Sequence, residues 1–284
     1  MVLEALRFSR AAKSLEVLDQ LKVPQEKVYI PVRSAQEAYE VVKSMQVRGA
    51  PLLAMVSALG LAVEALQAPM GKERLLERMA FLKTSRPTAV NLCNTMERLR
   101  QVVEQAESDA EASKAYVAAA ERMLLEDVAA NQAIGDAGAD AILAAMRAAG
   151  RQGGARVLTI CNTGALATAG WGTAQGVLRT LHARGKLEMA YCLETRPYNQ
   201  GSRLTAWLGA RKRDGGTGRS LVIGSLEVIP PSAKVRASGR WLTGHSHLRL
   251  YGWGSDAQGY RRLRGGSDQV RSKLGDARSQ DTLN

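Results

Sequence analysis

The fold of this chain is decided by the stretch Val157-Leu-Thr-Ile-Cys-Asn-Thr-Gly-Ala-Leu-Ala-Thr-Ala-Gly-Trp171. Its first residues form a short apolar run, which predicts a buried parallel strand ending at Cys161. Turn residues follow at 162–164, and the Ala-rich segment from Ala165 predicts a helix that opens directly out of the turn. The stretch therefore predicts a strand, a polar turn and a helix, an arrangement that places backbone amides around an anion.

Cys161 has two interpretations. A thiol at the carboxyl end of a parallel strand lies where ligands of open α/β sheets bind, and the positive end of the following helix would favour a reactive thiolate. The alternative is a buried structural cysteine, because free Cys is among the most buried residue types. This stretch alone leaves both interpretations open.

The length and composition indicate a folded protein. The 284 residues suffice for two domains of about 100 to 200 residues each, and 45% hydrophobic with 23% charged residues excludes wholesale disorder. No run of about 18 apolar residues and no signal-peptide pattern is visible, so a membrane protein is not expected. Three cysteines match neither a disulfide framework nor a zinc site. We therefore expect reduced thiols, no metal, and a cytoplasmic or nuclear location.

Most of the net charge of +12 lies in residues 207–284, where 14 Lys and Arg stand against 6 Asp and Glu. Only Leu221–Ile229 resembles a strand there, and His245 and His247 have no further His and no Cys nearby to complete a metal site. We expect this basic tail to be poorly ordered. A basic excess without aromatic stacking motifs supports nucleic-acid binding only weakly, so that function ranks last.

The first 150 residues are expected to form a mostly helical domain with a small β element. Alternating apolar and polar positions predict two or three antiparallel strands within residues 1–33, and Ser34-Ala-Gln-Glu37 is a capping box that predicts a helix start. Pro87 is expected to begin a later helix, capped by Thr84 or Ser85. Helices are predicted over residues 35–47, 51–67, 87–105, 108–131 and 136–149.

A second domain is predicted after the Gly-rich break at residues 150–156. The run 189–194 predicts another strand, so two βα units in succession indicate a parallel sheet. Cys192 lies inside this strand and is expected to be a packing residue. Gln200 and Arg203 follow it, where they could face the same crevice as Cys161. The expected fold is α/β: a helical domain at 1–150 and an incomplete Rossmann-like domain at 151–206.

Two arginines stand beside predicted helix starts. Arg48 precedes the helix that begins near Pro51, and Arg86 directly precedes Pro87. A guanidinium beside the unpaired amides of a helix start is expected of a phosphate site. Taken singly, either arginine could instead be a surface residue paired with a carboxylate.

Four segments occur in the order and spacing of one known family. They are Arg48-Gly-Ala-Pro51, Ser85-Arg-Pro-Thr-Ala-Val-Asn91, Cys161-Asn-Thr-Gly-Ala-Leu-Ala-Thr168 and Glu194-Thr-Arg-Pro-Tyr-Asn-Gln-Gly201. Over residues 1–206 the chain resembles the methylthioribose-1-phosphate isomerase family, which is related to the regulatory subunits of translation initiation factor 2B. The resemblance implies an active site between a helical and a Rossmann-like domain, no cofactor, and a homodimer.

The resemblance also implies an activity and roles for residues. The activity is conversion of 5-methylthioribose 1-phosphate to 5-methylthioribulose 1-phosphate in methionine salvage. Cys161 would be the active-site thiol. The implied substrate-binding residues are Arg48, Gly49, Ala50, Arg86 and Gln200.

The resemblance ends after Ala206. The family's catalytic aspartate lies in a Gly-Ala-Asp-Arg segment, which this sequence lacks, and Asp214, Asp256 and Asp268 stand in unlike contexts. We therefore expect a truncated or alternative product with little or no activity. A non-catalytic regulatory subunit that binds sugar phosphates or nucleotides is the alternative function.

Overall fold

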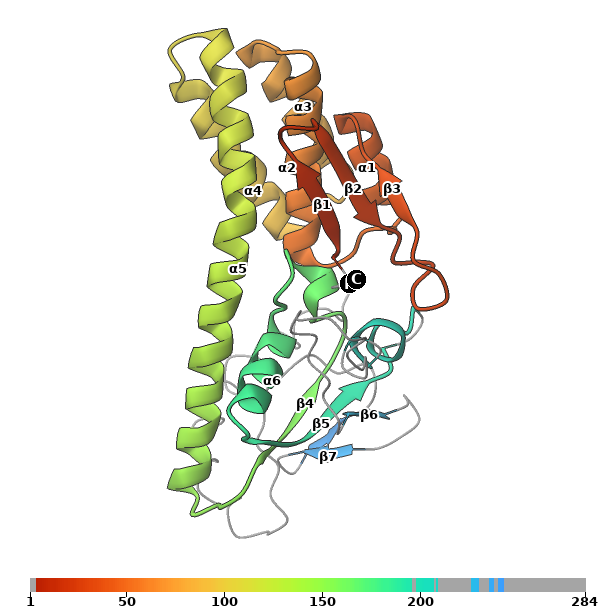
Figure 1. The fold of residues 1–284 in the computed structure, drawn as a ribbon, viewed down its shortest axis with the longest axis vertical. Helices are drawn as coiled ribbons and strands as arrows, with labels where there is room; N and C mark the ends of the chain where they lie inside the picture. The colour runs from red at the N-terminus through yellow and green to blue at the C-terminus, as the bar shows by residue number, and fades with distance from the viewer. Residues whose placement is uncertain are drawn as a thin grey trace, which may run out of the picture.

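A small antiparallel sheet and a bundle of helices form the first part of the protein (Figure 1). The computed structural model describes residues 4–195, 198–206 and 208, together with the backbone of 226–229, 235–237 and 240–242. The sheet has the order β1-β2-β3, with antiparallel neighbours. The strands are β1 (Leu6–Ser9), β2 (Ser14–Leu18) and β3 (Tyr29–Pro31). They confirm the strands predicted near the N-terminus.

The capping box begins α1 (Ala35–Lys43) as predicted. Ser34 Oγ accepts a hydrogen bond from the amide of Glu37 at 3.2 Å, and the Glu37 carboxylate accepts one from the amide of Arg33 at 2.6 Å. The helix ends four residues before the predicted end, because Ser44 caps it and Met45 adopts a positive φ of 65°. The backbone thereby turns toward Arg48.

The next helix, α2 (Ala50–Gln67), is the centre of the first core, and 13 of its 18 residues are buried. By length and composition it could cross a membrane, which the sequence argument missed because Pro51, Ser57 and Glu64 interrupt the apolar run. In the fold 72% of this window is buried inside the protein. Its apolar character therefore matches a core helix surrounded by α1, α4 and α5.

The start predicted for the helix at residues 87–105 is wrong, and the helix before it was not predicted. The preceding helix α3 (Lys72–Lys83) ends at Thr84, and α4 (Val90–Gln105) begins three residues after Pro87. The Ser85 hydroxyl donates to the carbonyl of Leu82 at 2.7 Å, so it closes α3 instead of capping α4. The predicted end at residue 105 is confirmed.

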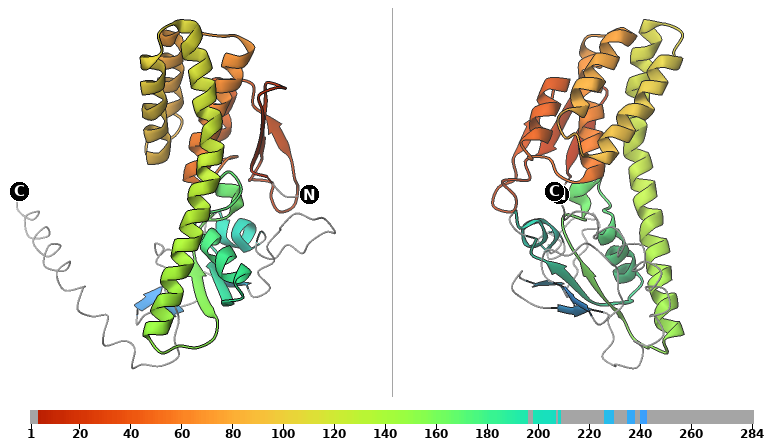
Figure 2. Two further views of the ribbon diagram at one scale, coloured as in Figure 1. Left: turned by 60° about the vertical axis from the view of Figure 1, so that its left-hand side comes forward. Right: turned by 180° about the vertical axis from the view of Figure 1, so that it is seen from behind.

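A single helix, α5 (Asp109–Ala148), replaces the two helices predicted between residues 108 and 149. Its 40 residues span about 60 Å, and Figure 2 shows it running along both parts of the molecule. The gap left between the two predicted helices, residues 132–135, is helical, and Gly135 and Gly138 pack against α6 (Ala174–Ala183). A Cβ on Gly135 would lie 2.9 Å from Thr180 Oγ1, so close helix packing explains this glycine.

The second part contains the predicted parallel sheet. Strand β4 (Ala155–Thr159) pairs in parallel with β5 (Leu187–Leu193), and α6 connects them. Together with the helical first part, these elements confirm the α/β fold. Cys192 on β5 is buried, and burial raises the pKa of its thiol to about 12, as fits a packing residue.

A third parallel strand comes from the basic segment. Strand β6 (Leu226–Ile229) pairs with β5, and β7 (Val235–Ala237) pairs with β8 (Arg240–Leu242) in a separate antiparallel ribbon. The parallel sheet thus extends past the boundary expected at residue 206. The expectation of poor order for the remainder of 207–284, and the contexts of His245, His247, Asp214, Asp256 and Asp268, lie outside the described residues.

Candidate active site

Cys161 lies two residues beyond the end of β4 and is exposed, which contradicts the interpretation as a buried structural cysteine. Its amide donates to Thr195 Oγ1 at 3.2 Å, and its carbonyl accepts from Thr205 Oγ1 at 2.5 Å. Cys161 has φ 73°, a left-handed conformation that L-residues adopt only where the surroundings enforce it. The neighbouring loops therefore hold the thiol residue in a fixed, strained geometry.

The helix predicted directly after the turn is wrong. Only one turn of 3₁₀ helix, η1 (Ala165–Ala167), follows, and α6 begins at Ala174. Gly170 and Gly172 have positive φ values of 135° and 93°, so the chain makes an extra loop before the helix. The positive end of a long helix consequently does not follow Cys161 directly.

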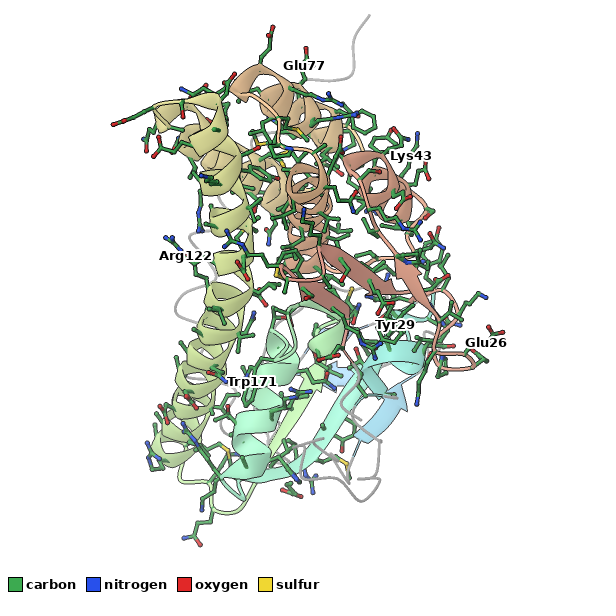
Figure 3. All side chains as sticks on the ribbon, turned by 45° about the horizontal axis from the view of Figure 1, so that its top comes forward. Glu26, Tyr29, Lys43, Glu77, Arg122 and Trp171 are labelled. Carbon is green, nitrogen blue, oxygen red and sulfur yellow. The ribbon has the colours of Figure 1, made fainter. Side chains whose placement is uncertain are left out.

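The loop between η1 and α6 is held against α5. Asp127 Oδ2 accepts from the amide of Ala169 at 2.7 Å, and burial raises the pKa of this carboxyl group. Arg179 donates to the carbonyl of Gly170 at 3.2 Å, and its guanidinium lies 5.5 Å from the centre of the Trp171 ring. Figure 3 shows Trp171 beside the long helix. These contacts fix the segment that follows the thiol.

Gln200 meets Cys161, as its place after the next strand predicted. The Cys161 thiol donates to Gln200 Oε1 at 3.5 Å. Thr195 and Asn199 in the same loop have positive φ values of 63° and 50°. Strained residues therefore lie on both loops that meet at the thiol, a feature common at functional sites. The second loop continues into the short helical segment η2 (Gly201–Ala206).

Arg48 reaches this site from the first part of the molecule. Its side chain is only 4% exposed; Nε donates to the carbonyl of Met45 at 3.0 Å, and the guanidinium lies 4.4 Å from the centre of the Tyr198 ring. Nη1 and Nη2 have no hydrogen-bond partner among the described residues. Burial, and then the charge of Arg203, lower the pKa of Arg48. Two buried, unpaired donors on a cation are suited to bind an anion.

Arg86 and Arg203 complete a cluster of three arginines with Arg48. The charges of Arg86 and Arg203 both act on Arg48, and Cys161 is close enough to interact with it as well. Burial also lowers the pKa of Arg203. Within the described residues, none of the three forms an ion pair with a carboxylate, so Arg48 and Arg86 do not match the alternative of a paired surface residue. The cluster has the charge and donors to bind a phosphate group.

Gly49 and Ala50 connect Arg48 to α2 and bring the two parts of the molecule together. Gly49 has φ 105°, and a Cβ placed on it would lie 2.4 Å from the Cα of Ala167 in η1. The residue is therefore a glycine for two reasons, its backbone conformation and the close approach of the Ala167 backbone. This contact joins residues 48–50, called the arginine loop below, to the segment that follows Cys161.

Two residues of the site were not predicted to belong to it. Tyr198, which lies in the quoted segment Glu194–Gly201 but was given no role, stacks on Arg48, and the buried Gln20, which lies in no quoted segment, bonds to the segment after Cys161. Arg203 was predicted only as a residue of the crevice. It donates to the carbonyls of Tyr198 and Gln20 at 3.1 and 3.0 Å and also to that of Val23. Such contacts between distant segments are visible only in the folded chain.

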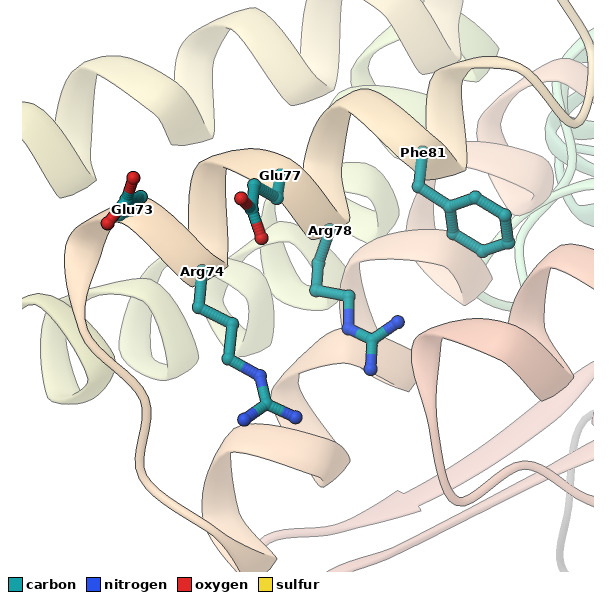
Figure 4. A pocket seen from close by; sticks show the side chains of 5 residues that line it. All are labelled: Glu73, Arg74, Glu77, Arg78 and Phe81. Atoms are coloured by element: carbon teal, nitrogen blue, oxygen red, sulfur yellow. The ribbon is translucent and has the colours of Figure 1, made fainter.

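A hollow of about 530 Å³ lies elsewhere, on the outer face of α3 (Figure 4). It is lined by Glu73, Arg74, Glu77, Arg78 and Phe81. Arg78 forms an ion pair with Glu64 at 3.0 Å, and the alternating charges are typical of a solvated helix face. The hollow is separate from the site at Cys161, because α3 lies at the top of Figure 1 and β4, which leads to Cys161, lies in the lower half.

Several known proteins are similar to this chain in sequence and in fold. A methylthioribose-1-phosphate isomerase of Pyrenophora tritici-repentis is 47% identical over 218 residues, which cover 73% of this chain and 55% of that protein. The crystal structure of 5-methylthioribose 1-phosphate isomerase from Pyrococcus horikoshii matches with a TM-score of 0.66 and 30% identity, covering 81% of this chain and 60% of the other. That of the translation initiation factor eIF-2B delta subunit from A. fulgidus matches with a TM-score of 0.62 and 33% identity, covering 81% and 63%.

The extent of these matches establishes the family. The chain spans little more than half the length of the curated relatives it matches. The sequence profile of the Initiation factor 2 subunit family matches residues 46–213, which is more than half of the chain and contains the arginine loop, the thiol and Gln200. The chain therefore belongs to the Initiation factor 2 subunit family.

Proposed function

We propose that this chain binds 5-methylthioribose 1-phosphate and carries the thiol of a methylthioribose-1-phosphate isomerase of methionine salvage. The observation that supports this most is the buried guanidinium of Arg48, which has two unpaired nitrogens beside Arg86, Arg203 and the exposed thiol of Cys161. A phosphate would supply the missing acceptors and charge. Relatives named for this isomerase agree with the proposal.

The chemistry of the reaction suits this arrangement. Conversion of an aldose to a ketose moves a hydrogen between C2 and C1 while negative charge develops, and positioned donors stabilise that charge. The arginines would hold the phosphate on C1, which sets the distance from C1 and C2 to Cys161. Gln200 accepts from the thiol and so fixes its direction. The binding residues and the thiol thus come from four segments, before α2 and after α3, β4 and β5.

We expect the chain itself to turn over this substrate only weakly. The phosphate on C1 blocks simple opening of the sugar ring, so a general acid must assist, and this sequence lacks the Gly-Ala-Asp-Arg segment that supplies it in the family. Formation of ketose phosphate by the purified chain measures this. Turnover equal to that of a full-length relative assayed in parallel would contradict the expectation.

Alkylation of cysteines tests the proposed binding site directly. Saturating 5-methylthioribose 1-phosphate is expected to slow iodoacetamide labelling of Cys161 at least about tenfold, because the bound sugar would cover an exposed thiol. Cys93 is partly exposed, but its thiol contacts the carbonyl of Pro87 next to Arg86, so the control is the labelling rate of Cys161 in the denatured chain with and without the same ligand. Peptide mass spectrometry separates the sites, and buried Cys192 reports unfolding. Unprotected Cys161 at saturation would contradict the proposed site.

The alternative function is that of a non-catalytic regulatory subunit. The structural match to the eIF-2B delta subunit is the observation on its side. The exposed thiol in Cys161-Asn-Thr-Gly164 and the names of the sequence relatives favour the isomerase. Replacing Cys161 by serine in a full-length relative's framework separates the two. Unchanged turnover would transfer support to the regulatory function.

A further inference from the structure

A buried glutamine joins the two parts of the molecule at the candidate site. Gln20 follows β2 and is 0% exposed. Its backbone amide donates to the carbonyl of Gln46, and its backbone carbonyl accepts from Arg203 at 3.0 Å. Its side chain crosses to the segment after the thiol, where Nε2 donates to the carbonyl of Leu166 at 2.7 Å and Oε1 accepts from Asn162 at 3.1 Å.

These partners allow only one orientation of both amide side chains. The backbone carbonyl of Leu166 can only accept, so Gln20 must present its NH₂ group there and its oxygen to Asn162. Asn162 must then present its own NH₂ group to Gln20. The Asn162 carbonyl oxygen is consequently the atom left over, and turning the amide around would place two oxygens face to face.

The remaining oxygen of Asn162 lies in an unusual position. Asn162 is 7% exposed, and its Oδ1 has no hydrogen-bond partner among the described residues. Buried side-chain oxygens are rarely left unpaired, and this one belongs to the residue that directly follows the exposed thiol. A neutral acceptor on the residue next to Cys161, linked through Gln20 to Arg203, is suited to a hydroxyl group of a ligand whose phosphate the arginines hold.

We propose that Gln20 is a positioning residue: it orients Asn162 so that the Asn162 side-chain oxygen accepts a hydrogen bond from a hydroxyl group of the bound sugar phosphate. The proposal rests on the proposed function and adds the source of sugar recognition to it. The arginines bind the phosphate of any phosphate ester, whereas Asn162 distinguishes the sugar from inorganic phosphate. Gln20 contributes only through Asn162.

Calorimetric titration with two ligands tests whether the arginines bind the phosphate group and Asn162 recognises the sugar. For the full chain, the ratio of the dissociation constants of inorganic phosphate and 5-methylthioribose 1-phosphate measures recognition of the sugar. Gln20→Met and Asn162→Ala are both uncharged changes, and each is expected to lower this ratio about tenfold, the effect of losing one hydrogen bond, while phosphate binding stays within about twofold. The double variant is expected to match Asn162→Ala alone, because Gln20 acts through Asn162.

Ser113→Ala is the matched control for lost buried hydrogen bonds. Ser113 accepts from the amide of Met70 at 3.1 Å and donates to its carbonyl at 3.0 Å, and it lies near the start of α5. It is expected to leave both dissociation constants unchanged. Asn162→Ala with an unchanged ratio would overturn the proposal, as would a double variant whose losses are additive. Equal weakening of both ligands would indicate general disruption and also overturn it.

A second measurement, the rate of Cys161 alkylation, requires no ligand. Gln20→Met and Asn162→Ala are each expected to raise the rate of Cys161 alkylation at least about twofold, because the turn after the thiol loses its anchor, and Ser113→Ala is expected to leave it unchanged. A wild-type chain that does not prefer the sugar phosphate to phosphate contradicts the proposed function. In that case the labelling rates decide whether Gln20 positions the Asn162 turn, and unchanged rates overturn that role.

Discussion

Replacing Arg48 by methionine is expected to weaken the binding of inorganic phosphate about a hundredfold. Nη1 and Nη2 of Arg48 are buried and have no partner among the described residues, so both are available to charge-assisted hydrogen bonds with phosphate oxygens. The loss of such bonds amounts to about 3 kcal/mol, which corresponds to roughly two powers of ten in the dissociation constant. Calorimetric titration with phosphate at fixed ionic strength measures it.

The same substitution is expected to leave the free energy of unfolding within about 1 kcal/mol of the wild type, with a gain as the expected sign. Methionine removes a cation that burial and Arg203 already destabilise, and this relief offsets the lost bond to Met45 and the contact with Tyr198. Chemical denaturation without phosphate measures this quantity. This combination, weaker phosphate binding with an unchanged free energy of unfolding, is expected of a residue that serves binding rather than stability.

Arg98→Met is the matched control for Arg48→Met. Arg98 is an exposed arginine that pairs with Glu126 at 2.6 Å, a surface ion pair worth at most about 1 kcal/mol. We expect the control to bind phosphate as the wild type does. If Arg48→Met retained phosphate affinity, or lost as little as Arg98→Met, the anion site would not be where the arginine cluster places it.

Gly49→Ala is expected to lower the free energy of unfolding by about 3 kcal/mol or more. Its Cβ would lie 2.4 Å from Ala167 Cα, 2.5 Å from Ala167 Cβ and 2.7 Å from the Ala167 carbonyl oxygen. These backbone atoms cannot turn aside, so the arginine loop and η1 must separate. The backbone of Gly49, with φ 105° and ψ 128°, adds a penalty of about 1–3 kcal/mol for any residue with a Cβ. Denaturation monitored by circular dichroism measures the total.

Gly153→Ala separates the two causes. Gly153 has a similar φ of 96°, but an added Cβ meets no atom within 4 Å. This control is expected to lose only the conformational part, about 1–3 kcal/mol. Adding Ala167→Gly to Gly49→Ala is expected to give little recovery, because the Ala167 Cα and carbonyl oxygen remain in place. Equal losses in the two single variants would show that the approach of η1 contributes nothing.

The candidate site could be predicted where a residue type is tied to a local requirement. Arg48 and Gly49 before the proline of α2, and Cys161 after β4, stand at ends of elements whose apolar runs are visible in the sequence. Hydrophobic periodicity locates such elements, and turn residues mark their ends. The prediction failed where packing outweighed local preference. Gly135 and Gly138 continue α5 because α6 approaches them, and α6 begins at Ala174 rather than after the turn.

The sequence by itself determined the α/β class, the strands and helices that carry the motifs, and the identity of the thiol, because these depend on neighbours along the chain. Only the tertiary structure decided that the charges of Arg86, Arg203 and Cys161 act on Arg48, and that none of the three arginines forms an ion pair among the described residues. It also decided that Gln20 reaches Asn162 across 142 positions of sequence. The physical reason is that burial, charge repulsion and the matching of donors to acceptors are properties of atoms brought together by folding, and no local pattern encodes them.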